Sequence, residues 1–205
     1  YYASRGLGDV YKRQHQPLPT RAEASDVANA IYDRTSAIML SGECAQGDYP
    51  VECVKTMVKI ANRVEPEIHY WKRFSNNEDL DLSNDVTKIA YSACVTAKNM
   101  NADAIVTYTH TGDSVRKLAG LGAGCPILAI TDNKRTFHQL ALAWNVTPIY
   151  VEAGATIEET IDKGIEKLKN KEILEKGDVV VLSGGAKTFS SGMTKKVIGG
   201  ILRID

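Results

Sequence analysis

The chain has 205 residues, 43% of them hydrophobic and 24% charged, and its 25 basic residues balance its 25 acidic residues to a formal net charge of zero. This composition is typical of a folded protein with one large or two small domains, and it argues against a disordered chain. The charge balance argues against nucleic acid as the main partner, because neutralising many phosphates requires a surplus of Lys and Arg.

Membrane insertion, secretion and metal binding are equally poorly supported. No apolar run approaches the roughly 18 residues of a membrane span, and the first residues lack the apolar centre of a secretory signal. We therefore expect a soluble cytoplasmic protein with no membrane partner. The cysteines are too widely spaced for a zinc or redox motif, so we expect reduced, mostly buried thiols and no metal site formed by this chain alone. They are Cys44, Cys53, Cys94 and Cys125.

The first part of the chain predicts a helix, a strand and a second helix. Residues 1–16 lack periodicity, and we interpret them as a disordered or extraneous leader. Thr20 and Glu23 then have the spacing of a capping box at the start of a helix. The apolar run Ala37–Leu40 predicts a buried strand. Pro50 opens a second helix, whose apolar stripe is Val51, Val54, Val58 and Ala61. We assign residues 17–70 to this first domain.

The remainder of the chain alternates helices and strands after a polar segment at 71–84, which we interpret as a linker. Residues 85–205 form the second predicted domain. Its strands are expected at 104–108, 126–131, 146–151, 178–182 and 197–204. Its helices are expected at 85–99, from Ser114, at 134–144 and from Thr156, which has capping-box spacing to Glu159. This alternation predicts a three-layer α/β domain with a mostly parallel five-stranded sheet.

Two loops have a composition suited to an anion. Ligands of open parallel sheets bind beyond the carboxyl ends of the strands, where helix N-termini point. The loop after the first strand of the sheet offers the hydroxyls of Thr109, Thr111 and Ser114. Its Gly112 allows the backbone to approach a ligand, and a helix N-terminus follows. The alternative is an ordinary helix cap formed by Asp113 or Ser114.

The second loop, 183–194, follows the fourth strand and contains glycines, hydroxyls and Lys187. It is not a P-loop, because Ala186 stands where that motif requires Gly, and a flexible hairpin connection is the alternative. If the two strands are neighbours in a parallel sheet, both loops converge on one ligand. Elsewhere, Ser41 and Glu43 end the predicted strand of the first domain. There a carboxylate can serve as a base, a proton relay or a helix cap.

Several segments together resemble pyruvate kinase from about Pro17 to the end of the chain. In the first domain these are PTRAEASDVANA from Pro19, IMLSGE from Ile38 and GDYPVE from Gly47. In the second they are LAWNVTP from Leu142 and GDVV from Gly177. The resemblance implies a fold in which residues 17–70 are the end of a TIM barrel, a partial helix–strand–helix segment, and residues 85–205 are the C-terminal regulatory α/β domain.

The implied activity is transfer of a phosphoryl group from phosphoenolpyruvate to ADP, giving pyruvate and ATP. Magnesium and potassium are implied cofactors of the full-length enzyme, and a homotetramer is the implied assembly. The family's catalytic lysine and its metal-binding residues all match positions upstream of Pro17. We therefore expect no bound metal and no phosphoryl transfer from this chain alone. Accessory catalytic candidates remain: Ser41 and Glu43, which match the last barrel strand, and Arg21 and Glu23, which match a helix near the active site.

The resemblance also implies a site for a phosphorylated effector. Thr109, Thr111, Gly112 and Ser114 match the family's phosphate loop. Lys187, Ser190, Ser191 and Gly192 match its second effector loop. Asp113 departs from the pattern, because effector-responsive members often have Lys or Arg there, and its charge would repel a phosphate. The alternative function is a stand-alone anion-binding or interaction module without enzymatic activity.

Overall fold

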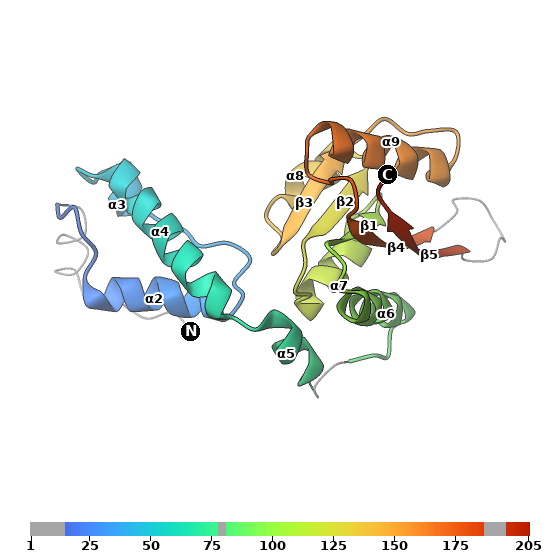
Figure 1. Cartoon of the computed structure of the whole chain (residues 1–205). Coiled ribbons are helices and arrows are strands. Elements are labelled where there is room, and N and C mark those ends of the chain that lie inside the picture. The colour runs from blue at the N-terminus through green and yellow to red at the C-terminus, as the bar shows by residue number, and fades with distance from the viewer. Residues whose placement is uncertain (1–14, 78–80, 187–195) are drawn as a thin grey trace. The chain divides into compact units, whose positions relative to one another are not determined.

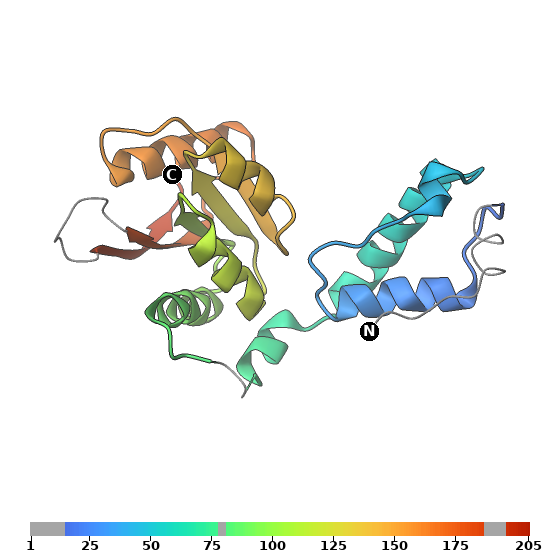
Figure 2. The same ribbon diagram turned by 180° about the vertical axis from the view of Figure 1, so that it is seen from behind.

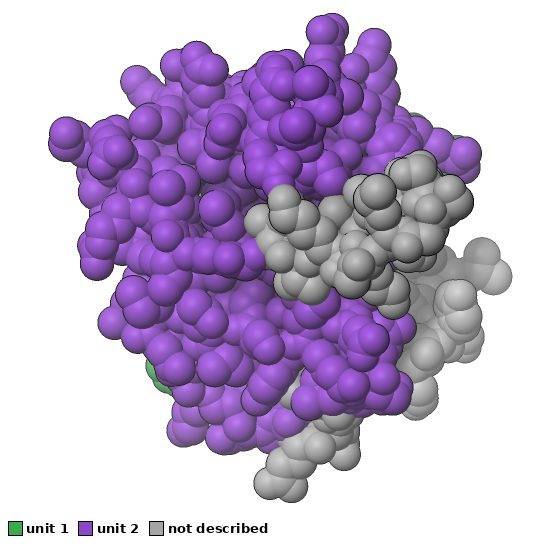
Figure 3. Space-filling model, turned by 90° about the vertical axis from the view of Figure 1, so that its right-hand side faces the viewer, with its two compact units in different colours: residues 1–69 green, residues 70–205 purple. Residues whose placement is uncertain are grey.

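The computed structural model describes residues 15–77, 81–186 and 196–205, and the chain divides into two compact units, residues 1–69 and 70–205 (Figures 1 and 3). Within the described residues, no helix combines the length and the apolar character needed to cross a membrane.

Unit 1 is built around two helices, α2 (Arg21–Tyr32) and α4 (Pro50–Val64), with a short helix α3 (Gly42–Ala45) and a 3-10 turn η1 (Glu65–Glu67). The predicted capping box at the start of α2 is confirmed. The Thr20 hydroxyl accepts a hydrogen bond from the Glu23 backbone N–H, and the Glu23 carboxylate accepts the Thr20 N–H at 2.7 Å. Pro50 occupies the first turn of α4, where its missing N–H has no intrahelical role.

The strand predicted at Ala37–Leu40 does not form, and the side chain of Met39 is 84% exposed. A strand exists only through hydrogen bonds to a neighbour, and the described part of unit 1 contains no other strand to supply them. The second predicted helix forms as α4, but three residues of its apolar stripe, Val51, Val54 and Val58, are about half exposed. Among residues 15–69 only Ile68 is buried.

Unit 2 is an α/β domain with a five-stranded sheet in the order β3-β2-β1-β4-β5. The sheet is parallel except for the last pair, β4 and β5, which is antiparallel. Its strands are β1 (Ala104–Tyr108), β2 (Ile127–Thr131), β3 (Val146–Tyr150), β4 (Val179–Ala186) and β5 (Lys196–Arg203). Its helices are α5 (Tyr70–Ser75), α6 (Asp85–Met100), α7 (Asp113–Leu121), α8 (Lys134–Leu140) and α9 (Ile157–Asn170). The predicted fold class is confirmed.

Helices cover both faces of this sheet (Figures 1 and 2). One core cluster joins Ile105 and Ile127 to α6, α7 and Leu140 of α8. The other joins Val106 and Leu128 to Ile161 and Leu168 of α9. Consecutive strand residues therefore enter opposite cores. This is why the central strands are apolar throughout rather than alternating with polar residues.

The segment predicted as a linker, 71–84, begins with the second residue of helix α5 and contributes to the core of unit 2. Phe74 is only 4% exposed and lies 5.9 Å from the Trp71 ring and 5.4 Å from the Tyr91 ring, centroid to centroid. Helix α5 has no clear periodicity, but the packing of Trp71 and Phe74 into the core buries enough apolar surface to order it. Helix α8 is also shorter than predicted, because the chain turns after Leu140.

Candidate functional site

The carboxyl ends of β1, β2 and β4 lie at the same edge of the sheet. Strand β1 pairs in parallel with β2 on one side and with β4 on the other, with Tyr108 opposite Ile130 and Thr107 opposite Ser183. The loops that follow β1 and β4 therefore start from neighbouring strands at one edge, as the prediction of a shared site requires. Four residues proposed for the second loop lie outside the described residues: Lys187, Ser190, Ser191 and Gly192.

The loop after β1 forms a tight turn into helix α7. Buried Thr109 accepts a hydrogen bond from the Gly112 N–H through its hydroxyl, at 2.8 Å. Gly112 adopts a positive φ of 88° and is the N-cap of α7. Because glycine has no side chain, it offers no cap to the first amide groups of the helix, which point beyond its N-terminus. Thr111 is exposed and Ser114 partly exposed, so two of the three predicted hydroxyls are accessible there.

Arg116 balances the charge of Asp113, a feature that the sequence analysis missed. The Arg116 guanidinium lies 3.5 Å from the Asp113 carboxylate and donates hydrogen bonds to the Thr111 carbonyl and to Gln139 of α8. The pair is exposed, so its own contribution is at most about 1 kcal/mol. The Arg116 cation nevertheless lies beside Asp113, the carboxylate that was expected to repel a phosphate. The signal was present as the i,i+3 spacing of opposite charges on a helix.

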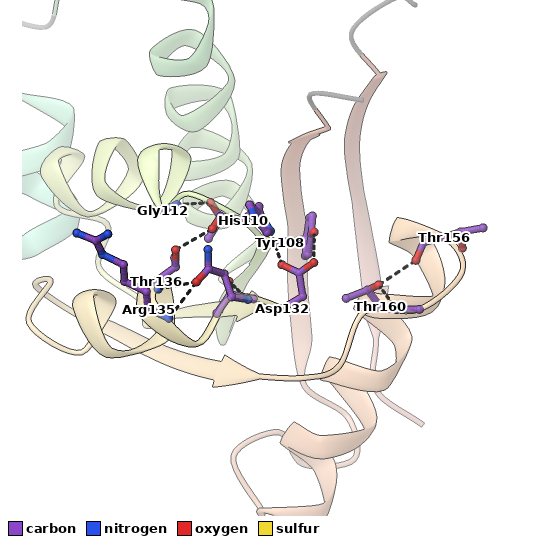
Figure 4. A network of polar contacts seen from close by, with 12 residues as sticks. Tyr108, His110, Gly112, Asp132, Arg135, Thr136, Thr156 and Thr160 are labelled. Carbon is purple, nitrogen blue, oxygen red and sulfur yellow. Dashed lines mark hydrogen bonds and ion pairs between the residues drawn. The ribbon is translucent and has the colours of Figure 1, made fainter. Parts of the chain in front are cut away.

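A second set of polar contacts links this loop to the loop after β2 (Figure 4). His110 Nδ1 lies 2.7 Å from one carboxylate oxygen of Asp132, and the Tyr108 hydroxyl donates to the other at 3.3 Å. The Thr136 hydroxyl donates to the His110 carbonyl at 2.7 Å. Burial, and then the nearby Asp132 charge, raise the pKa of Tyr108 to about 12, which keeps its hydroxyl protonated as a donor.

The structure brings together only part of the barrel-end candidates. Glu23 and Glu43 both line a cavity of about 230 Å³ between α2 and α4, together with Cys53, Met57 and Ile60. Burial, and then the nearby Cys44 and Glu43, raise the pKa of the Cys53 thiol.

Each of the two carboxylates already has a structural contact. Glu43 accepts the Ser41 backbone N–H at 2.9 Å, and Glu23 completes the cap of α2. The other two candidates, Arg21 and Ser41, are exposed. In the parts of the chain that the structure describes, no three His, Cys, Asp or Glu side chains are grouped to hold a metal ion.

Two family models match the chain in succession. One is described as pyruvate kinase, barrel domain, and matches residues 11–54. The other is described as pyruvate kinase, alpha/beta domain, and matches residues 87–197.

Curated relatives carry the same name. A pyruvate kinase of Clostridium acetobutylicum is 40% identical over 178 residues, which are 87% of this chain and 38% of that protein. Pyruvate kinases of Sporosarcina psychrophila and Geobacillus stearothermophilus are 38% and 39% identical, over 92% and 88% of this chain and 33% and 31% of their own lengths. The chain thus spans about a third of the length of the relatives it matches.

Proposed function

The chain belongs to the pyruvate kinase family, a family of transferases, and from this we propose that it supplies the C-terminal part of an enzyme that transfers phosphoryl from phosphoenolpyruvate to ADP. The observation that carries the proposal is the order of the two family matches, the barrel domain falling within unit 1 and the α/β domain within unit 2. In this proposal, unit 1 contributes the end of the catalytic barrel and unit 2 is the regulatory domain.

We further propose that residues 1–205 alone do not catalyse this reaction. A barrel pocket requires a closed ring of strands, and the described part of unit 1 contains none. Magnesium and potassium neutralise the transferring phosphoryl group in such a reaction, and by the family resemblance the residues that would hold them match positions upstream of Pro17. In the full-length enzyme, Ser41, Glu43, Arg21 and Glu23 would be accessory residues near the pocket.

The direct test is a coupled assay of pyruvate formation. The purified chain receives phosphoenolpyruvate, ADP, magnesium and potassium, and a full-length relative serves as the positive control. We expect no turnover above the rate without protein. Sustained turnover that scales with the concentration of the chain would refute the proposed inactivity while supporting the assigned reaction.

For unit 2 we propose a binding site for a phosphorylated effector at the loop 109–114. The support is local: an N-cap glycine at positive φ, accessible Thr111 and Ser114 hydroxyls, and Arg116 beside Asp113. Phosphate oxygens would accept hydrogen bonds from the first amide groups of α7, where the helix dipole also favours an anion. Lys187, Ser190, Ser191 and Gly192 would complete the site from the neighbouring loop.

A thermal-shift titration with inorganic phosphate and a hexose phosphate tests this site. A ligand at 100 times its Kd stabilises the folded state by about 2.7 kcal/mol, which is a shift of several degrees for a domain of this size. Ser114→Ala should weaken the response, whereas Ser92→Ala on α6 is the matched control. The absence of any shift with either ligand would contradict the effector site.

We also propose that the full-length protein is a cytoplasmic homotetramer that binds ADP, ATP and phosphoenolpyruvate. The family membership supports this assignment, and light scattering of the full-length protein would test the assembly. A stand-alone anion-binding module is not favoured, because the curated relatives cited above carry the name pyruvate kinase across both matched regions.

A further inference from the structure

Asp132 has contacts that neither the family match nor the proposed effector loop explains. Its side chain is only 16% exposed, directly after β2, and its two oxygens have partners at the end of β1 and in the loop that follows β1. His110 approaches one oxygen and Tyr108 the other (Figure 4). A largely buried carboxylate is costly unless its oxygens receive hydrogen bonds, so these two contacts account for its position.

The chemistry of these contacts determines which nitrogen of His110 carries the proton. An ionised carboxylate only accepts hydrogen bonds, so the His110 Nδ1 that lies 2.7 Å away must be the donor. The distance lies in the range of charge-assisted hydrogen bonds. Asp132 thereby selects the Nδ1–H tautomer of His110 and fixes the orientation of the ring.

The backbone of His110 is also tied to the β2–α8 segment. The Thr136 hydroxyl, on a side chain only 4% exposed, donates to the His110 carbonyl. On the N-terminal side, the Thr109 N–H donates to the Ile130 carbonyl at 2.9 Å. The turn at 109–112 is therefore held at three points by residues between 130 and 136: the Thr109 backbone, the His110 carbonyl and the His110 ring.

We propose that Asp132 is a positioning residue for the loop 109–114, acting through His110. This inference rests on the proposed effector site for its functional consequence, because the turn at 109–112 sets the direction of Gly112 and of the first amide groups of α7. The ring contact can be removed by one substitution at Asp132, which lies outside strand β2, and the other two connections do not involve the Asp132 side chain. Loss of the Asp132 carboxylate loosens the turn and weakens phosphate binding there.

The test compares Asp132→Ala, which removes the acceptor, with Asp132→Asn, which retains an oxygen for the Nδ1–H but no charge. Asp162→Ala, at an exposed position on α9, is the matched control for loss of one negative charge. The wild type and the three variants are compared as the 205-residue chain. Three quantities are measured: the ¹⁵N chemical shifts of the His110 ring at a pH at which imidazole is neutral, the hydrogen-exchange rate of the Gly112 amide, and the Kd for inorganic phosphate.

In Asp132→Ala we expect loss of the Nδ1–H tautomer and exchange at Gly112 faster by about tenfold or more, the effect of losing a hydrogen bond to a charged group. Asp132→Asn should retain most of the tautomer, and Asp162→Ala should match the wild type. The Kd for phosphate should rise about tenfold in Asp132→Ala.

An unchanged tautomer and unchanged exchange in Asp132→Ala would overturn the inference, whether or not phosphate binds the wild type. If the tautomer and exchange change as expected but the wild type binds neither phosphate nor a hexose phosphate, the effector site fails and the positioning of the turn by Asp132 stands. Global unfolding of Asp132→Ala would be recognised by circular dichroism, and the comparison then rests on Asp132→Asn, whose Gly112 exchange must exceed that of Asp162→Ala.

Discussion

Replacing Gly164 with alanine should destabilise unit 2, although alanine is the better helix former. Gly164 lies buried in α9, against the sheet. A Cβ there would lie 2.4 Å from Cδ1, 2.6 Å from Cγ1 and 2.7 Å from Cγ2 of Ile130. Ile130 is fully buried on β2, and three of its atoms are too close, so no single rotation of its side chain relieves the clash.

The magnitude is the difference of two opposing effects. Overpacking a well-filled core costs about 1–3 kcal/mol, and the close approach of three atoms places this site at the upper end. The gain in helix propensity from Gly to Ala is about 1 kcal/mol. We therefore expect a net loss of about 2 kcal/mol in the free energy of unfolding, or a fall in Tm of roughly 5–10 °C for a unit of this size.

Thermal and urea unfolding followed by circular dichroism measure this loss, and Gly120→Ala is the matched control. Gly120 is an exposed helical glycine on α7, and a Cβ there would meet nothing within 4 Å. The free energy of unfolding of the Gly120→Ala protein should therefore rise by up to about 1 kcal/mol, whereas that of Gly164→Ala should fall. In an Ile130→Ala background, Gly164→Ala should cost less than in the wild type, because the clashing atoms are gone. A Gly164→Ala protein as stable as the wild type would refute this description of the α9–β2 contact.

Three further outcomes are expected. Limited proteolysis should cut unit 1 first and leave a resistant product close to residues 70–205, because α2 and α4 contain no buried residue; resistance of both units to the same degree would contradict this. Gly112→Ala should destabilise unit 2 by about 1 kcal/mol or more, since a Cβ at a φ of 88° is strained and would lie 2.9 Å from the Arg116 guanidinium; thermal unfolding beside Gly120→Ala measures it. Stability should fall as the pH rises above about 9, because burial raises the pKa of Cys94 to about 12 and the unfolded thiol loses its proton first; the slope of Tm against pH should become smaller in Cys94→Ala.

Local sequence signals were sufficient for most of unit 2. The apolar runs of β1 and β2 act within a few residues, so their structural consequences can be recognised one segment at a time. The same is true of the cap at Thr20 in unit 1. The capping box predicted at Thr156 and Glu159 is confirmed only in its first half. The Thr156 hydroxyl accepts the Glu159 N–H, and the Glu159 carboxylate accepts the N–H of Ala155.

Unit 1 shows where such signals fail. Ala37–Leu40 has the composition of a buried strand, but a strand needs a neighbour, and none is present in the described part of this unit. The valines of α4 have helical spacing and are half exposed for the same reason: spacing identifies an apolar face, and only a partner buries it. Conversely, Trp71 and Phe74 lie in a segment without periodicity and still pack into a core.

By itself the sequence determined the α/β class, the loops at the carboxyl ends of the strands and the family, because these depend on the order of short apolar segments and on contiguous motifs. Only the tertiary structure decided which residues from different segments meet. The contacts of Asp132 with His110, of Thr136 with the His110 carbonyl and of Gln139 with Arg116 each join residues at least 22 positions apart. Such pairs follow from the order of the strands in the sheet, and no local pattern of charge or hydropathy specifies that order.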